Sequence, residues 1–77
     1  DESTAFLENE YMLTAREIEV LRLLNMGLSR NEIAETLSIS INTAKKHLSN
    51  IYAKMGVRNK TEALEGFTHG IGQREAD

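Results

Sequence analysis

The sequence predicts an all-α, four-helix helix-turn-helix domain whose third helix is the recognition helix. Four segments begin with a residue that can cap a helix, and their apolar residues recur at helical spacing rather than in alternation. The 77 residues contain no proline and no strand signal. A chain of this length forms one small domain, so we expect its helices to be well capped and well packed.

The first predicted helix covers about residues 15–26. Thr14 and Glu17 have the spacing of a capping box, in which each side chain accepts a hydrogen bond from the other residue's backbone N–H. Gly27 suits the left-handed conformation that often ends a helix. We expect the apolar residues of this helix to be buried, namely Ile18, Val20, Leu21, Leu23, Leu24 and Met26.

The second and fourth helices start from similar signals. Ser29 and Glu32 form another predicted capping box, ahead of a helix over about residues 30–37. Asn59 is the predicted cap of the fourth helix, over about residues 60–68.

The third predicted helix covers residues 41–55, with Ser40 as its cap and Gly56 at its end. Residues 38–39 are left as a short turn after the second helix. A short helix, a tight turn and a longer helix make the helix-turn-helix pattern.

This third helix has two contrasting faces at about 100° per residue. One is mainly apolar and is expected to be buried: Ile41, Ala44, Leu48, Ile51, Tyr52 and Met55. The other is basic and amide-rich, without an acid: Asn42, Lys45, Lys46, Ser49 and Asn50. Such side chains can donate hydrogen bonds to phosphates and to base edges, so this face favours DNA binding.

The distribution of charge supports that interpretation although the net charge is −3. Residues 1–12 contain four acids and no base, whereas residues 38–60 contain five bases and no acid. A local excess of positive charge beside an apolar stripe is typical of a DNA-binding face.

Other functional classes find little support. The chain has no cysteine, and its two histidines are far apart, so we expect no metal site and no cofactor. Without a paired nucleophile and base or a phosphate-binding glycine loop, we do not expect an enzyme. No apolar run approaches ~18 residues, so a membrane contact is expected only through a preceding region. We expect a cytoplasmic location.

We expect three regions along the chain. Residues 1–12 are interpreted as a linker from a missing N-terminal sensing or receiver region, because the chain starts at Asp1 without a methionine. Residues 13–69 form the DNA-binding domain, and residues 70–77 are expected to be a flexible tail.

The helices also carry a family pattern. It consists of L-T-x-R-E-x-E-V-L at 13–21, G-L-S at 27–29, E-I-A at 32–34, T-A-K-K-H-L-S-N-I-Y-x-K-M at 43–55 and T-E-A at 61–63. These residues resemble the LuxR-type (GerE-like) helix-turn-helix domain of bacterial transcription regulators. Two positions depart from the family pattern, since Asn31 replaces a basic residue and Ala44 replaces valine.

The resemblance implies that residues 41–55 enter the major groove of double-stranded DNA and that a dimer binds an inverted repeat. The candidate base contacts are Lys45, Lys46 and Ser49 by resemblance, with Asn42 added from its position. The candidate phosphate contacts are Thr43, Ser29, Arg30, Asn31, Lys54, Arg58 and Lys60. The candidate dimer residues are Thr61, Leu64 and Glu65.

Two alternatives stay open at this point. Region four of a sigma factor resembles the sequence through residue 55 and would act as a monomer within RNA polymerase. A protein-interaction module that has kept the fold and lost DNA binding would explain the net acidity. RNA polymerase is also the candidate protein partner of a LuxR-type regulator.

Overall fold

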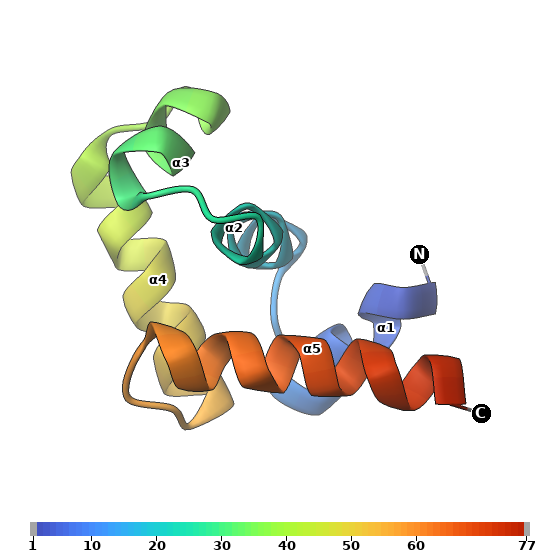
Figure 1. Ribbon diagram of the computed structural model, residues 1–77. Coiled ribbons are helices and arrows are strands. Elements are labelled where there is room, and N and C mark those ends of the chain that lie inside the picture. Colours follow the sequence, from blue (N-terminus) through green and yellow to red (C-terminus); the bar gives the residue numbers. More distant parts are fainter. Residues whose placement is uncertain (1, 77) are drawn as a thin grey trace.

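The computed structural model describes the backbone of residues 2–76 and the side chains of residues 5–68. Over those residues the chain forms five helices and no strand, which confirms the all-α prediction. The helices are α1 (Glu2–Tyr11), α2 (Ala15–Asn25), α3 (Arg30–Leu37), α4 (Ile41–Met55) and α5 (Lys60–Ala76). Figure 1 shows α2 end-on at the centre, with α3 and α4 on one side of it and α5 crossing below.

Every helix contributes to a single core. The largest fully buried side chains come from α1 to α4: Leu7, Val20, Leu21, Ile33 and Ile51. Ala63 and Phe67 add the buried face of α5. Because α4 packs against α2, α3 and α5 at once, the other helices determine its direction.

The predicted caps are present. The backbone N–H of Glu17 donates to Thr14 Oγ1 over 3.1 Å, and that of Thr14 donates to Glu17 Oε1 over 2.9 Å. Ser29 and Glu32 form the second capping box in the same way, over 3.2 and 2.8 Å. These bonds satisfy N–H groups that a helix start leaves without a partner.

The helix-turn-helix follows the predicted boundaries. Ser38 ends α3 in the left-handed conformation, with φ of 57°. Ser40 then caps α4, because its Oγ accepts the backbone N–H of Thr43 over 3.0 Å. The two helices are therefore joined by a turn of three residues, 38–40.

The N-terminal segment differs from the expected linker because residues 2–11 form α1. Leu7 is fully buried, and the rings of Phe6 and Tyr11 meet edge to face with centroids 6.2 Å apart. Only a few apolar residues anchor this helix, which packs on the neighbouring α2 and on α5 at the far end of the chain. Its weak local periodicity explains why the sequence did not indicate it.

The last helix is also longer than predicted. It continues to Ala76 and so includes most of the segment expected to be a flexible tail, although the side chains after residue 68 lie outside the described ones. A Cβ at Gly66 would lie 2.8 Å from Met55 Cε and 3.6 Å from Tyr11 Oη. The end of the flexible Met55 side chain would have to move to admit this Cβ, so α5 approaches α4 closely here without strictly requiring glycine.

Two residues assigned to buried faces are exposed. Met26 is 72% exposed and Ile41 is 44% exposed. Met26 is the C-terminal cap of α2 and Ile41 is the first residue of α4, so both lie at helix ends rather than in a helix interior. Within the described helices, none is long and apolar enough to cross a membrane.

Candidate nucleic-acid interface

The outer face of α4 is exposed as the sequence predicted. Ala44, Leu48, Ile51 and Met55 are buried on its inner side. The polar side chains on the outer side are all exposed: Asn42, Lys45, Lys46, Ser49 and Asn50. Four of these are the candidate base contacts, and the structure brings them onto one accessible helix face.

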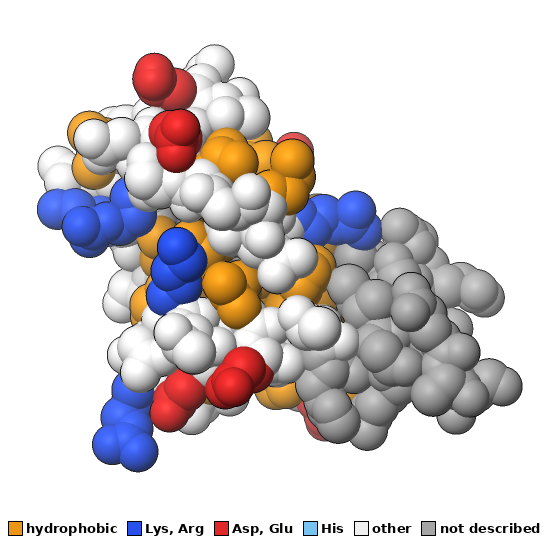
Figure 2. Space-filling model, in the orientation of Figure 1, with side chains coloured by type: hydrophobic (Ala, Val, Ile, Leu, Met, Phe, Trp, Pro, Cys, Tyr) orange, Lys and Arg blue, Asp and Glu red, His pale blue; other side chains and the backbone are white. Residues whose placement is uncertain are grey.

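A groove runs beside this face, between the starts of α3 and α5 and the middle of α4. It has a volume of about 560 Å³ and an apolar floor formed by Leu24, Leu28, Leu48 and Tyr52. Its polar lining residues are Ser29, Arg30, Lys45, Ser49 and Lys60. Figure 2 shows Lys and Arg side chains around an apolar strip on this side of the molecule.

The groove joins candidate base contacts to candidate phosphate contacts. Lys45 and Ser49 come from α4, while Arg30 and Lys60 each occupy the first position of a helix. No described acidic side chain lines it. Burial raises the pKa of Tyr52 on its floor, against the opposing charge of Arg30. Positive charge and hydroxyl donors at one concave surface suit a phosphate backbone.

The remaining phosphate candidates lie outside the groove. Asn31 and Arg58 are exposed near the starts of α3 and α5. The hydroxyl of Thr43 belongs to the cap of α4, where it accepts a hydrogen bond from Ser40 Oγ over 2.9 Å. These three side chains are accessible but do not line the same concavity.

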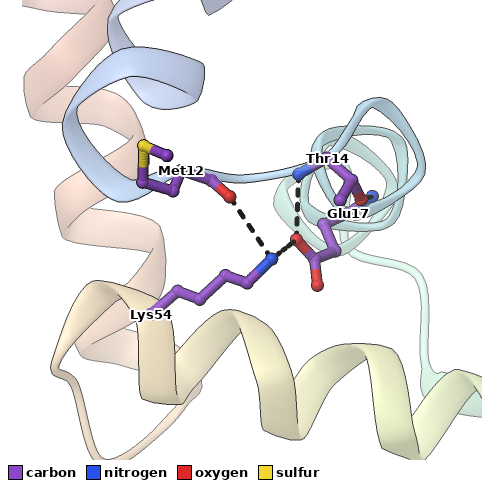
Figure 3. Close-up of polar contacts among 4 residues, drawn as sticks. All are labelled: Met12, Thr14, Glu17 and Lys54. Carbon is purple, nitrogen blue, oxygen red and sulfur yellow. Dashed lines mark hydrogen bonds and ion pairs between the residues drawn. The ribbon is translucent and has the colours of Figure 1, made fainter.

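Lys54 has a different environment from the other bases. Its Nζ lies 2.7 Å from Glu17 Oε1 and 3.3 Å from the carbonyl oxygen of Met12. Figure 3 shows Lys54 pointing toward both residues. Lys54 follows Lys45 by nine residues, or two and a half helical turns, so the two point to opposite sides of α4. The structure therefore does not bring Lys54 to the groove.

Glu17 has a second role that its capping signal did not indicate. Its side chain is only 5% exposed and forms an ion pair with Lys54. Burial raises the pKa of Glu17, but hydrogen bonds from Lys54 and Thr14, together with the charge of Lys54, lower it below the ordinary value. The partners are 37 residues apart in sequence, so no local pattern could have linked them.

The candidate dimer residues share one face of α5. Thr61 and Glu65 are exposed, and Leu64 is half-buried. With Lys60 and Thr68 they line a shallow, mostly apolar depression of about 530 Å³. Among the described residues, no group of His, Cys, Asp or Glu side chains is arranged to hold a metal ion.

Comparison with known proteins identifies the family of this chain. Residues 11–65 match the family described as bacterial regulatory proteins, luxR family. The chain is 51% identical over 53 residues to the CsgBAC operon transcriptional regulatory protein of Escherichia coli strain K12, covering 69% of this chain and 24% of that protein. It is 55% identical over 51 residues to the transcriptional regulatory protein LnrK of Bacillus subtilis strain 168, covering 66% and 23%.

A solved structure of a bacterial response regulator also resembles this chain. The crystal structure of the response regulator ChrA, in a heme-sensing two-component system, matches with a TM-score of 0.68 and 44% identity, over 82% of this chain and 29% of that one. The chain thus spans about a quarter of the length of these relatives. The family match also favours a LuxR-type domain over region four of a sigma factor. The chain therefore belongs to the luxR family of bacterial regulatory proteins, a family of DNA-binding transcription regulators.

Proposed function

We propose that this domain recognises a specific sequence in double-stranded DNA by placing α4 in the major groove. The observation that carries the proposal is the exposed, acid-free outer face of α4 beside the basic groove. The base contacts are assigned to Lys45, Lys46, Ser49 and Asn42, whose side chains offer the donors that base edges accept.

The groove is assigned to the DNA backbone. Arg30 and Lys60 place positive charge on its two sides, and Ser29 adds a hydroxyl. Asn31, Thr43 and Arg58 are further phosphate contacts, exposed near the same helix starts. Contacts of this kind fix the position of a protein on the duplex, while the α4 side chains provide sequence preference.

The proposed assembly is a dimer on an inverted repeat. Thr61, Leu64 and Glu65 line the mostly apolar depression on α5, which offers a surface for the same face of a second copy. In symmetric helix-turn-helix dimers the half-sites lie about one helical turn apart.

The greater length of the relatives supports a proposal for the organisation of the whole protein. A sensing or receiver region would precede α1, which would connect it to the DNA-binding domain from residue 13 onward. The DNA-binding domain would act in the cytoplasm, where RNA polymerase is the candidate protein partner. Any attachment to a membrane would come through the preceding region.

Selection from a random duplex library tests this function. We expect an inverted repeat to be enriched, with log K falling against log salt at a slope of about −2.7 per subunit if Arg30, Arg58 and Lys60 each neutralise one phosphate. The double variant Lys45→Ala/Lys46→Ala should lose about 1–3 kcal/mol per lost base contact. Arg16→Ala/Arg22→Ala removes the same charge from the exposed side of α2 and should retain sequence preference.

The outcome of this experiment distinguishes DNA recognition from the remaining alternative, a protein-interaction module. If no sequence is enriched and the α4 double variant binds DNA like the wild type, the outer face of α4 does not recognise DNA. The domain would then be a protein-interaction module that has kept the fold. A single copy bound to an asymmetric site would contradict the dimer while leaving the role of α4 intact.

A further inference from the structure

Three separate parts of the chain meet at the Nζ atom of Lys54. Lys54 belongs to the last turn of α4, Glu17 to the first turn of α2, and Met12 to the connector between α1 and α2. Figure 3 shows the amino group between Glu17 Oε1 and the Met12 carbonyl oxygen. We call these three residues the Lys54 clasp.

Hydrogen bonds fix the positions of the groups that contact Lys54. Glu17 Oε1 accepts both Lys54 Nζ at 2.7 Å and the backbone N–H of Thr14 at 2.9 Å, so the carboxylate is held by α2 itself. Met12 has a left-handed backbone, with φ of 59°, while its side chain is 74% exposed. The Lys54 amino group on α4 contacts the backbone carbonyl oxygen of Met12.

The Glu17 carboxylate of the clasp is buried, so its charge needs a partner within the fold. The Glu17 side chain is 5% exposed, and a buried carboxylate requires a nearby cation or several donors. Lys54 is its only ion-pair partner among the described residues. The pair therefore constrains where the last turn of α4 can lie relative to α2.

We propose that Lys54 is a positioning residue for sequence recognition, which holds α4 against α2 and the connector so that its outer face points toward DNA. The inference rests on the proposed DNA binding. Because α4 is one continuous helix of 15 residues, fixing its last turn also fixes the direction of Lys45 and Lys46 two turns earlier. Small losses of alignment weaken contacts that depend on geometry.

A phosphate contact is the competing role for Lys54. Its Nζ already has two oxygen acceptors, one of them charged, on the side of α4 opposite Lys45. A phosphate approaching there would meet the Glu17 carboxylate as well. The two roles also predict different dependence on salt, because loss of a phosphate contact lowers the salt slope by about 0.9 and weakens all sequences alike.

The experiment compares the wild type, Lys54→Arg and Glu17→Gln/Lys54→Met in titrations with the selected duplex and a scrambled duplex of equal composition. The double variant removes both charges, so it leaves no unpaired buried carboxylate that would destabilise the domain. Circular dichroism confirms that each variant is folded. Arg16→Met/Glu19→Gln is the matched control, since it also removes one pair of opposite charges, at an exposed site on α2. Lys60→Met instead removes one charge from the groove.

The double variant should lower the ratio of selected to scrambled affinity at least about tenfold with the salt slope unchanged. Lys54→Arg should stay within about threefold of the wild type, because the guanidinium keeps the positive charge and donates hydrogen bonds to carboxylates. An unchanged ratio would overturn the proposal, and an unchanged ratio with a smaller slope would assign Lys54 to phosphate. If the wild type itself fails to discriminate between the duplexes, the proposed function fails before the clasp is tested, and the positioning role falls with it.

Discussion

Lys45 and Lys54 lie on the same helix and differ in almost everything else. Lys45 is exposed, lines the groove with Arg30 and Lys60, and has no ion pair among the described side chains. Lys54 lies on the opposite flank and is held by Glu17 and the Met12 carbonyl. We call the side of α4 that carries Lys45 the groove flank and the side that carries Lys54 the clasp flank. The positive charge of Lys45 on the groove flank is therefore available to a ligand, whereas that of Lys54 on the clasp flank is already paired within the fold. Charge alone does not assign a role to a lysine.

The largest difference between the flanks should appear in stability. Lys54→Met leaves the Glu17 carboxylate buried without its cation, so we expect the free energy of unfolding to fall by about 2 kcal/mol. The loss is set below the ~3–5 kcal/mol of a fully buried pair because the Lys54 side chain is 34% exposed. Urea unfolding followed by circular dichroism measures it.

The matched change on the groove flank is Lys45→Met. It removes the same charge from an exposed position and should change the free energy of unfolding by less than about 0.5 kcal/mol. Equal effects of the two substitutions would mean that the flanks do not differ in the way the contacts indicate.

A smaller effect should distinguish the flanks in DNA binding. Lys60→Ala removes a groove charge, so affinities for the selected and scrambled duplexes should fall by a similar factor, less than about tenfold or about 1.4 kcal/mol. The slope of log K against log salt should become shallower by about 0.9. Titration at four or more salt concentrations measures both quantities.

The clasp double variant Glu17→Gln/Lys54→Met serves as the comparison, because it should keep the wild-type slope. If Lys60→Ala also keeps that slope, the groove does not hold a phosphate at Lys60. The assignment of the groove to the DNA backbone would then have to be abandoned at that position.

The local signals in the sequence were sufficient for the central helices. Capping boxes at Thr14 and Ser29 and the cap at Ser40 each involve residues three apart, so the bounds of α3 and α4 followed from the sequence. The exposed face of α4 followed from its helical period. The resemblance to the luxR family then supplied the fold and the direction of the functional assignment, which the family match supports.

Features that depend on distant contacts were not predictable in this way. α1 is stabilised by packing on α2 and α5, and its own sequence shows little amphipathic pattern. The Glu17–Lys54 pair joins residues 37 apart, and Lys54 therefore looked like one more base in an acid-free segment. The exposure of Met26 and Ile41 likewise depends on tertiary packing, because no other described helix covers the helix ends where they lie.

The smallest expected effect is a pH dependence that belongs to the clasp flank. The folded-state pKa of Glu17 lies below its ordinary value of 4.5. At pH values between these two pKa values, the unfolded chain therefore binds more protons than the folded one. The stabilisation is fully present above about 4.5 and is lost as pH falls through the lower folded pKa. Burial opposes the hydrogen bonds that lower this pKa, which is why we rank the effect last.

Urea unfolding between pH 3 and 7 tests this, with Glu17→Gln/Lys54→Met compared with the wild type. The stability difference between the two proteins should shift in favour of the wild type as pH rises from 3 to above 4.5. The control Arg16→Met/Glu19→Gln removes an exposed pair with a 3.3 Å separation, which should contribute little at any pH. A clasp variant with the same pH profile as the wild type would mean that the Glu17 carboxylate gains nothing from Lys54 on folding. The contrast between a flank whose charge is used within the fold and a flank whose charge is available to DNA would then lose its electrostatic basis.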